Sequence, residues 1–338
     1  GVVRSGASPQ LAEFAEKLNI PVANTFMAKG VIPFKHRCAL GSAGLQANDY
    51  VSCGFDKADV IICVGYDLVE YHPYLWHPER NRTIIHIDYS PAETDAHYPV
   101  AVGVIGDIKH SLDRIAQLTT PHQGAHVRPL RERLVLEMDQ HRDDLEYPVK
   151  PQKIIWDLRT ALNLEDIVVC DVGAHKMWMA RMFRCEYPNT CIISNGFASM
   201  GIAVPGAIAA KLVYPQRHVV AVTGDAGFMM NSQEIETAMR CKLPIVILIW
   251  NDSSYGLIEW KQMNQFQRSS NVHFTNPDFV AYAESFGAKG YRVERTADLP
   301  TILEEALAND TVSIIDCPVD YRENIKLTDQ LGTLVCPT

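Results

Sequence analysis

The sequence predicts an α/β protein of two domains, each built on a mainly parallel sheet flanked by helices. Strand-like runs alternate with amphipathic helical stretches along most of the chain, which is typical of parallel sheets. The runs at 218–223 and 245–250 are apolar throughout, as strands covered by helices on both faces are. The length of 338 residues is enough for two domains, each with its own core.

The composition and net charge of the chain limit the kinds of molecule that it is expected to bind. Hydrophobic residues make up 47% of the chain and charged residues 21%, and the net charge is −9, which argues against nucleic acid or an acidic membrane surface as partner. There is no apolar run of the roughly 18 residues that a membrane-spanning helix requires, and no signal-peptide pattern. We therefore expect a cytoplasmic protein. No CxxC or HExxH pattern predicts a zinc site.

The first domain is expected at residues 1–118. Residues 1–4 resemble the end of a strand that leads into a helix capped by Ser8, with Pro9 in the first turn. Strands are predicted at 20–26, 58–67 and 82–90, and the domain closes with a strand and a helix within 100–118. No GxGxxG nucleotide motif is present.

Residues 119–151 are predicted to form a linker that contains a charged helix bracketed by prolines. The second domain, 152–338, then begins with a helix, a buried strand and a turn, and ends in a tail at 327–338. We expect that tail to become ordered only over a bound ligand.

The centre of the second domain is a β-α-β unit at 218–256. Its strands should run parallel, so the turns that follow them should lie at the same edge of the sheet. Asp225 and Asp252, 27 positions apart, are therefore expected close together, where they suit Mg2+. The turn at 224–227 could offer main-chain N–H groups to a phosphate. Either turn taken alone is better explained as an ordinary loop, and it is the pair at this spacing that favours a metal-diphosphate site.

The helix of this unit has a local start signal, because Asn231 is in position to cap it and Glu234 follows at the third helical position. A further strand ends near Asp171 and His175, at the edge where open α/β sheets bind ligands. His175 is compatible with a phosphate contact and with a surface loop. A glycine-rich turn at 195–201 precedes a helix of small residues, which fits close helix–sheet packing, anion binding at the helix start, or both.

Two motifs carry a resemblance to a known family. The sequences GDAGF (224–228) and NDSSYG (251–256) resemble the two halves of the thiamine diphosphate motif. Residues 64–79, 281–294 and 317–327 resemble acetolactate synthases, particularly the flavin-independent, catabolic-type branch. The resemblance covers essentially the whole chain and implies a central domain and a diphosphate-binding domain, without the pyrimidine-binding domain that precedes them in the family.

The resemblance also implies roles for individual residues. Asp225, Asp252 and the main-chain carbonyl of Ser254 would bind Mg2+. Met200 would hold the two rings of the cofactor in a bent form, as the catalytic residue of this chain, and the carbonyl of Ala198 would accept a hydrogen bond from the aminopyrimidine. Ala226 and Gly227 would hold the diphosphate through their main-chain N–H groups, helped by Ala174 and His175. Further cofactor-binding residues would be Gly224, Tyr255 and Gly256.

The implied reaction is the decarboxylation of pyruvate on thiamine diphosphate and transfer of the two-carbon unit to a second 2-oxo acid, which gives 2-acetolactate. Family members are homodimers or homotetramers, and their activating glutamate lies in the pyrimidine-binding domain, so this chain alone should be inactive. Trp260 falls where a tryptophan favours 2-oxobutyrate as acceptor, or else it merely packs on its helix.

Two alternatives of different classes remain. The first is a pyruvate oxidase that uses FAD; it is disfavoured because YDLVEY (66–71) stands where the flavin-containing branch has an Arg-bearing stretch. The second is a non-catalytic fragment that dimerises through an apolar face.

Overall fold

The computed structural model describes residues 1–44, 50–121, 128–324 and 326–327, and the chain divides into two compact units. The first unit contains 1–137 and the short segment 185–189, and the second contains 138–184 and 190–326. Helix α4 (Arg128–Asp139) crosses the division, so the stretch 119–151 that we predicted as a linker is shared between the units. The predicted tail beyond Leu327 lies outside the described residues.

The first unit has the predicted parallel strands. β1 (Val22–Asn24) pairs with β2 (Ala39–Ser42), and a second sheet has the order β3-β4-β5 (Val60–Val64, Thr83–Asp88 and Val100–Ile105). Leu11, Phe14 and Leu112 belong to one apolar cluster with residues of both sheets. The helices are α1 (Ser8–Leu18), α2 (Tyr50–Asp56) and α3 (Ile108–Leu118), with short 3-10 turns at Phe26–Ala28 and Pro73–Leu75.

Two expectations for the start of the chain are wrong. Residues 2–6 form turns rather than the end of a strand. Ser8 is the first residue of α1 and does not cap it, because the N-cap position is Ala7 and no side chain caps the helix. Pro9 does lie in the first turn, where its missing N–H costs nothing.

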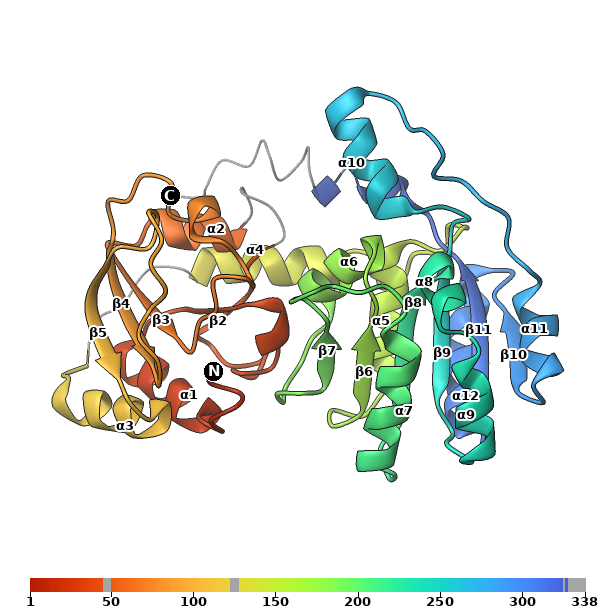
Figure 1. Cartoon of the computed structure of the whole chain (residues 1–338), viewed down its shortest axis with the longest axis horizontal. Helices are drawn as coiled ribbons and strands as arrows, with labels where there is room; N and C mark the ends of the chain where they lie inside the picture. The colour runs from red at the N-terminus through yellow and green to blue at the C-terminus, as the bar shows by residue number, and fades with distance from the viewer. Residues whose placement is uncertain (45–49, 122–127, 325, 328–338) are drawn as a thin grey trace. The chain divides into compact units, whose positions relative to one another are not determined.

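The second unit is one six-stranded parallel sheet in the order β10-β11-β9-β8-β6-β7 (Figure 1). Alternate residues of β8, such as Val219 and Ala221, pack in a core with α7, α9 and α11. Val220 and Val222 are equally buried and face the other side, where α5, α6 and α12 lie. The strands are β6 (Ile167–Cys170), β7 (Cys191–Ile193), β8 (Val219–Gly224), β9 (Val246–Asn251), β10 (Lys289–Arg292) and β11 (Ser313–Pro318).

The helices of the second unit lie on both faces of this sheet (Figure 1). Gly206 of α7 packs closely on β6, because a Cβ there would lie 2.9 Å from Cγ1 of Val169, which confirms the predicted tight helix–sheet contact. No helix in the described ranges is long and apolar enough to cross a membrane. The helices are α5 (Pro151–Ala161), α6 (Ala174–Met182), α7 (Ala203–Val213), α8 (Asp225–Met230), α9 (Glu234–Arg240), α10 (Gly256–Phe266), α11 (Phe279–Ser285) and α12 (Leu299–Ala308), with 3-10 turns at Thr296–Asp298 and Tyr321–Glu323.

The central β-α-β unit differs from the prediction in its helix. Residues 225–227, expected in a turn, are the first residues of the short helix α8. The predicted cap at Asn231 is wrong: α9 begins at Glu234 after Gln233, and no side chain caps it. Instead, the side-chain amide of Asn231 donates a 2.9 Å hydrogen bond to the carbonyl of Gly201, because that buried carbonyl also needs a donor.

Candidate functional site

Asp225 and Asp252 follow the carboxyl ends of neighbouring strands, as predicted. β8 and β9 are paired, with Gly224 opposite Trp250, so the first residues beyond both strands lie side by side. The main-chain N–H of Ser253 donates a 2.7 Å hydrogen bond to Oδ2 of Asp225, which joins the two turns directly. Figure 1 shows α8 and α10 beginning at this edge of the sheet.

The carboxylate of Asp225 is 1% exposed and is held on both oxygens. Oδ1 accepts a 2.8 Å hydrogen bond from the N–H of Ala226, and Oδ2 accepts a 2.7 Å bond from Nδ2 of Asn276 as well as the bond from Ser253. Burial raises the pKa of Asp225 more than these donors lower it. Its orientation is therefore fixed, while its negative charge is poorly compensated by the protein.

The environment of Asp252 points to a bound cation more strongly than that of Asp225 does. Burial and, after it, the neighbouring charge of Asp225 raise the pKa of Asp252 to about 8. Space for the carboxylate depends on Gly256, because a Cβ there would lie 2.8 Å from Oδ2 of Asp252. The described residues contain no group of three His, Cys, Asp or Glu side chains around a possible ion. A hard cation that takes two carboxylates and completes its shell with phosphate, carbonyl and water oxygens fits this pair.

The turn after β9 places the next three predicted residues. Ser253 adopts a left-handed backbone conformation (φ 53°), and Ser254 is buried with its hydroxyl donating 2.9 Å to Oε2 of Glu259. Tyr255 is 36% exposed, its ring lies 5.1 Å from that of Phe274, and Gly256 opens α10. The turn therefore brings the main chain of Ser254 to the acidic pair.

His175 lies beneath two turns of the site. A Cβ on Gly173 would be 2.7 Å from its ring, and one on Gly224 would be 3.5 Å away. The residue is 2% exposed, its Nε2 has no hydrogen-bond partner among the described residues, and burial lowers its pKa to about 3. The neutral ring bonds the main-chain carbonyl of Asp171 through its other nitrogen, so Nε2 is an acceptor, and a diphosphate oxygen at this point would be met by main-chain N–H groups at the start of α6, whose first residue is Ala174.

Asp171 ties the glycine-rich loop to this edge. Its carboxylate accepts hydrogen bonds from the N–H of Gly201, at 2.9 and 3.0 Å, and from the hydroxyl of Thr223, at 3.3 Å. Gly227 leaves room for it, because a Cβ there would be 3.3 Å from the carboxyl carbon of Asp171. The loop that carries Ala198 and Met200 is thereby fixed beside the ends of β6 and β8.

Ala198 and Met200 lie in the same loop; Ala198 is notable for its backbone conformation and Met200 for its partial burial. Ala198 has a left-handed backbone (φ 50°), which is uncommon for a residue other than glycine and often marks a functional site. Met200 is half-buried, and Phe197 in the same loop is fully exposed. Trp260 lies on α10, partly buried, and its Nε1 has no partner among the described residues.

Two residues at this edge were not predicted. Asn276 bonds Asp225 from the loop before α11, where no sequence pattern distinguishes it from an ordinary turn residue. Tyr321 follows β11 and could have been found, because the carboxyl end of β11 lies at the same edge as those of β8 and β9.

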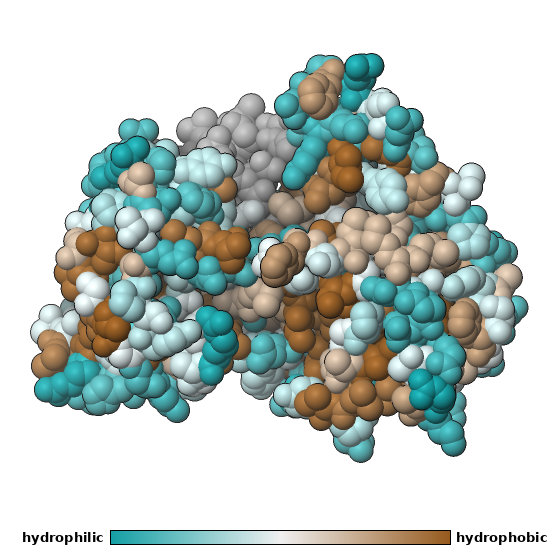
Figure 2. All heavy atoms as spheres, in the orientation of Figure 1, coloured by the Kyte–Doolittle hydropathy of each residue, from teal (hydrophilic) through white to brown (hydrophobic). Residues whose placement is uncertain are grey.

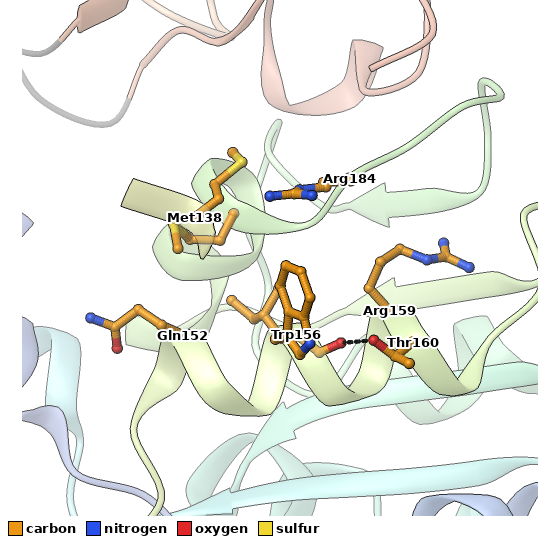
Figure 3. A pocket seen from close by; sticks show the side chains of 8 residues that line it. Met138, Gln152, Trp156, Arg159, Thr160 and Arg184 are labelled. Atoms are coloured by element: carbon orange, nitrogen blue, oxygen red, sulfur yellow. Dashed lines mark hydrogen bonds between the residues drawn. The ribbon is translucent and has the colours of Figure 1, made fainter. Parts of the chain in front are cut away.

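A separate cavity of about 190 Å³ contains none of the predicted site residues (Figure 3). Arg184 lies over the ring of Trp156 and pairs with Asp139, and Arg159 donates to the carbonyl of Leu162, so both cations at the cavity are already engaged. The cavity is lined by Met138, Gln152, Ile155, Trp156, Arg159, Thr160, Met182 and Arg184.

Two models of known protein families match the chain, and one of them covers β8 and β9, whose ends form this site. Residues 171–317 match the model of the thiamine pyrophosphate enzyme C-terminal TPP binding domain, and residues 1–115 match the model of the central domain of the same enzymes. The chain belongs to the thiamine pyrophosphate enzyme family. The predicted two-domain α/β fold and the resemblance to thiamine diphosphate enzymes are thereby confirmed. All the predicted cofactor and metal residues lie within the matched C-terminal domain.

Curated relatives of this thiamine pyrophosphate enzyme chain include acetolactate synthases. It is 37% identical to "Acetolactate synthase" of Bacillus subtilis over 96% of the chain and 58% of that protein. It is 34% identical to "Probable acetolactate synthase large subunit" of Methanocaldococcus jannaschii, over 99% and 58%, and 36% identical to "Acetolactate synthase, catabolic" of Raoultella terrigena, over 86% and 53%. The chain therefore spans a little over half the length of these relatives.

Proposed function

We propose that the full-length protein is a thiamine-diphosphate-dependent carboligase that makes 2-acetolactate from two molecules of pyruvate. The observation that carries the proposal is the alignment of relatives named acetolactate synthase along 86–99% of this chain. The buried acidic pair at the ends of β8 and β9 supports it, because it suits the metal that such a cofactor requires.

In this proposal Asp225, Asp252 and the main-chain carbonyl of Ser254 bind Mg2+. The first turns of α6 and α8 bind the diphosphate, since their main-chain N–H groups have no helical acceptor. The N–H of Ala226 is already bonded to Asp225, so Gly227 is the better donor of the pair. The remaining contacts are assigned to Ala174, His175, Gly224, Tyr255 and Gly256.

When bound, thiamine diphosphate supplies the carbanion chemistry that breaks and forms bonds beside a carbonyl group. The residues of this chain hold and orient it. Ala198, whose backbone is left-handed, would accept a hydrogen bond from the aminopyrimidine at its carbonyl, and Met200 would support the rings. Trp260 on α10 is proposed to influence which 2-oxo acid serves as acceptor.

An apolar surface in the second unit supports assembly into a homodimer or homotetramer. Ile202, Leu212 and Val213 at the two ends of α7 are 38%, 60% and 67% exposed. Figure 2 shows hydrophobic atoms gathered over this helix. Apolar side chains that gather into one exposed patch are a mark of a protein–protein interface.

The deciding experiment supplies the full-length protein with pyruvate, thiamine diphosphate and Mg2+ and measures acetolactate as acetoin after acid treatment. We expect acetolactate formation that stops when the metal is chelated and returns when Mg2+ is added back. Consumption of pyruvate without acetolactate, with acetate formed in the presence of oxygen, would instead favour an oxidase and contradict the proposal.

A further inference from the structure

Tyr321 lies at the edge of the site, in the 3-10 turn that follows a third strand. It follows β11, whose last residue Pro318 pairs with Asn251 at the end of β9. Its ring lies 6.3 Å from that of Trp250 at 31°, and a Cβ on Gly256 would be 3.4 Å from its Cδ2 atom. The ring therefore lies in a slot between β9 and the start of α10.

The segment around Tyr321 is anchored without help from its hydroxyl. Asp320 accepts a 3.0 Å hydrogen bond from the N–H of Arg322 and pairs with the guanidinium of the same residue. Glu323 accepts a 2.7 Å bond from Gln152, and Asn324 accepts a 2.7 Å bond from Nε1 of Trp178. The hydroxyl of Tyr321 is thus not needed to hold this turn in place.

Three polar groups are nevertheless left with an unpaired donor or acceptor at this point. Nε2 of His175 and Nε1 of Trp250 are buried and have no hydrogen-bond partner in the part of the chain that the structure describes, and the hydroxyl of Tyr321, whose oxygen the main-chain N–H of His175 approaches, has no acceptor there for its own proton. His175 is 2% and Trp250 0% exposed, and their rings are 6.2 Å apart. Buried unpaired polar groups cost free energy, so a cluster of them beside the first turn of α6 indicates a ligand that pairs with them.

The ligand chemistry follows from the surrounding charges. A phenol keeps its proton at neutral pH, so the hydroxyl of Tyr321 is a hydrogen-bond donor. The main-chain N–H of His175 also faces this hydroxyl. The hydroxyl of Tyr321 and the indole N–H of Trp250 are donors, whereas Nε2 of His175 is an acceptor, because the ring bonds the carbonyl of Asp171 through its other nitrogen. Two donors beside two carboxylates suit an anion that arrives with a divalent cation.

We propose that Tyr321 is a further cofactor-binding residue, whose hydroxyl donates a hydrogen bond to a diphosphate oxygen held at the start of α6 beside Asp225 and Asp252. This inference rests on the proposed function, since thiamine diphosphate with Mg2+ is the ligand that brings such an anion. The role assigned to Tyr321 is binding and orientation, with no part in proton transfer.

The test compares the full-length protein with its Tyr321→Phe variant, which keeps the ring and removes the hydroxyl. Titration calorimetry with thiamine diphosphate at saturating Mg2+ should show a Kd about tenfold weaker for the variant, the effect of one charge-assisted hydrogen bond. The melting temperature without cofactor should be unchanged or higher, because an unpaired buried group is removed. Tyr214→Phe, at a ring 43% exposed on the far end of α7, should match the wild type in both measurements.

Each other outcome overturns the inference in a distinguishable way. Equal affinities for wild type and Tyr321→Phe would overturn the role of the hydroxyl and leave the proposed function standing. A lower melting temperature of the variant without cofactor would show that the hydroxyl supports the fold instead. Failure of the wild type to bind thiamine diphosphate with Mg2+ would overturn the inference and the proposed function together.

Discussion

The side-chain amide of Asn276 donates a 2.7 Å hydrogen bond to Oδ2 of Asp225. The same amide lies 3.0 Å from Oδ1 of Asn251 and 3.3 Å from the hydroxyl of Ser253. One side chain from the loop before α11 thus connects the ends of β8 and β9. The position of Asp225 depends on a residue that is 51 positions away in the sequence.

Replacing Asn276 with alanine should weaken Mg2+ binding by about tenfold and lower the free energy of unfolding by about 1–3 kcal/mol. The reason is that Asp225 would lose its orientation and keep a buried oxygen with one donor fewer. Calorimetric titration with Mg2+ and thiamine diphosphate, together with urea unfolding, measures both effects. Asn264→Ala, at an exposed position on α10, is the matched control and should change neither. Unaltered Mg2+ affinity in Asn276→Ala would show that this amide does not position Asp225.

Substitutions at Asp225 and Asp252 should affect the stability of the metal-free protein and the binding of metal in opposite directions. Asp252→Asn removes a buried carboxyl group whose ionisation burial and the charge of Asp225 both oppose, so we expect the metal-free protein to melt a few degrees higher. Asp225→Ala or Asp252→Ala should abolish Mg2+-dependent binding of thiamine diphosphate because an oxygen ligand is lost, whereas Asp252→Asn keeps an amide oxygen at the same place and should only weaken that binding. Differential scanning calorimetry without metal and titration with it separate the two effects. If Asp225→Ala retained the wild-type affinity, the metal role would be refuted.

The sequence was sufficient to place Asp225 and Asp252 together. Continuous apolar strands imply a parallel sheet, and a parallel sheet brings the carboxyl ends of adjacent strands to one edge. The positions of Asn276 and Tyr321 could not be predicted with the same ease. They depend on how a loop and a later strand pack against that edge, and local sequence patterns carry no record of long-range packing.

Local start signals were less reliable than strand patterns. Asn231 looked like a helix cap, yet its amide bonds the carbonyl of Gly201, and α9 starts without a side-chain cap. Asp225 looked like a turn residue, yet it opens α8. In both cases a tertiary hydrogen bond outweighs a local preference of about 1 kcal/mol. The Gly-Asp-Ala-Gly stretch at 224–227 is compatible with a helix start as well as with a turn, because its small residues pack closely in either conformation.

Trp260→Gln in the full-length protein should change acceptor choice. We expect the preference for 2-oxobutyrate over pyruvate to fall by about tenfold, since an aromatic surface next to the acceptor favours the larger apolar side chain. Competition between the two 2-oxo acids, with both products quantified, measures this ratio. Met263→Gln, at an exposed position of the same helix, serves as control. An unchanged ratio would show that Trp260 only packs on α10.

The apolar surface at the end of α7 should control assembly. Leu212→Lys combined with Val213→Lys introduces charge where we expect a partner subunit, so the full-length protein should shift toward smaller species. Light scattering after size-exclusion chromatography reports the mass. Leu145→Lys, at a side chain 69% exposed outside α7, should leave the mass unchanged. The assembly proposal for α7 would fail if the double variant kept the wild-type mass.

Asp144 links stability to pH at the loop before α5. Burial alone would raise its pKa, but the ammonium of Lys150 at 2.9 Å, the N–H of Glu146 and the ring of His141 outweigh burial and lower it to about 2. Because the pKa in the folded state is below the unfolded value of about 3.9, the stabilisation is fully present above pH 4 and is lost as the pH falls toward 2.

The corresponding variant is Asp144→Asn. It should reduce the free energy of unfolding by about 1–2 kcal/mol at pH 6, a shift of this size being partly screened by solvent. The difference from wild type should shrink at pH 3, since the wild-type carboxylate then loses its advantage over the amide. Asp143→Asn is the control next to it, because the side chain of Asp143 is 84% exposed. Urea titrations of all three proteins at both pH values measure the effect, and a difference that stays constant from pH 6 to pH 3 would contradict the assignment to the Asp144–Lys150 pair.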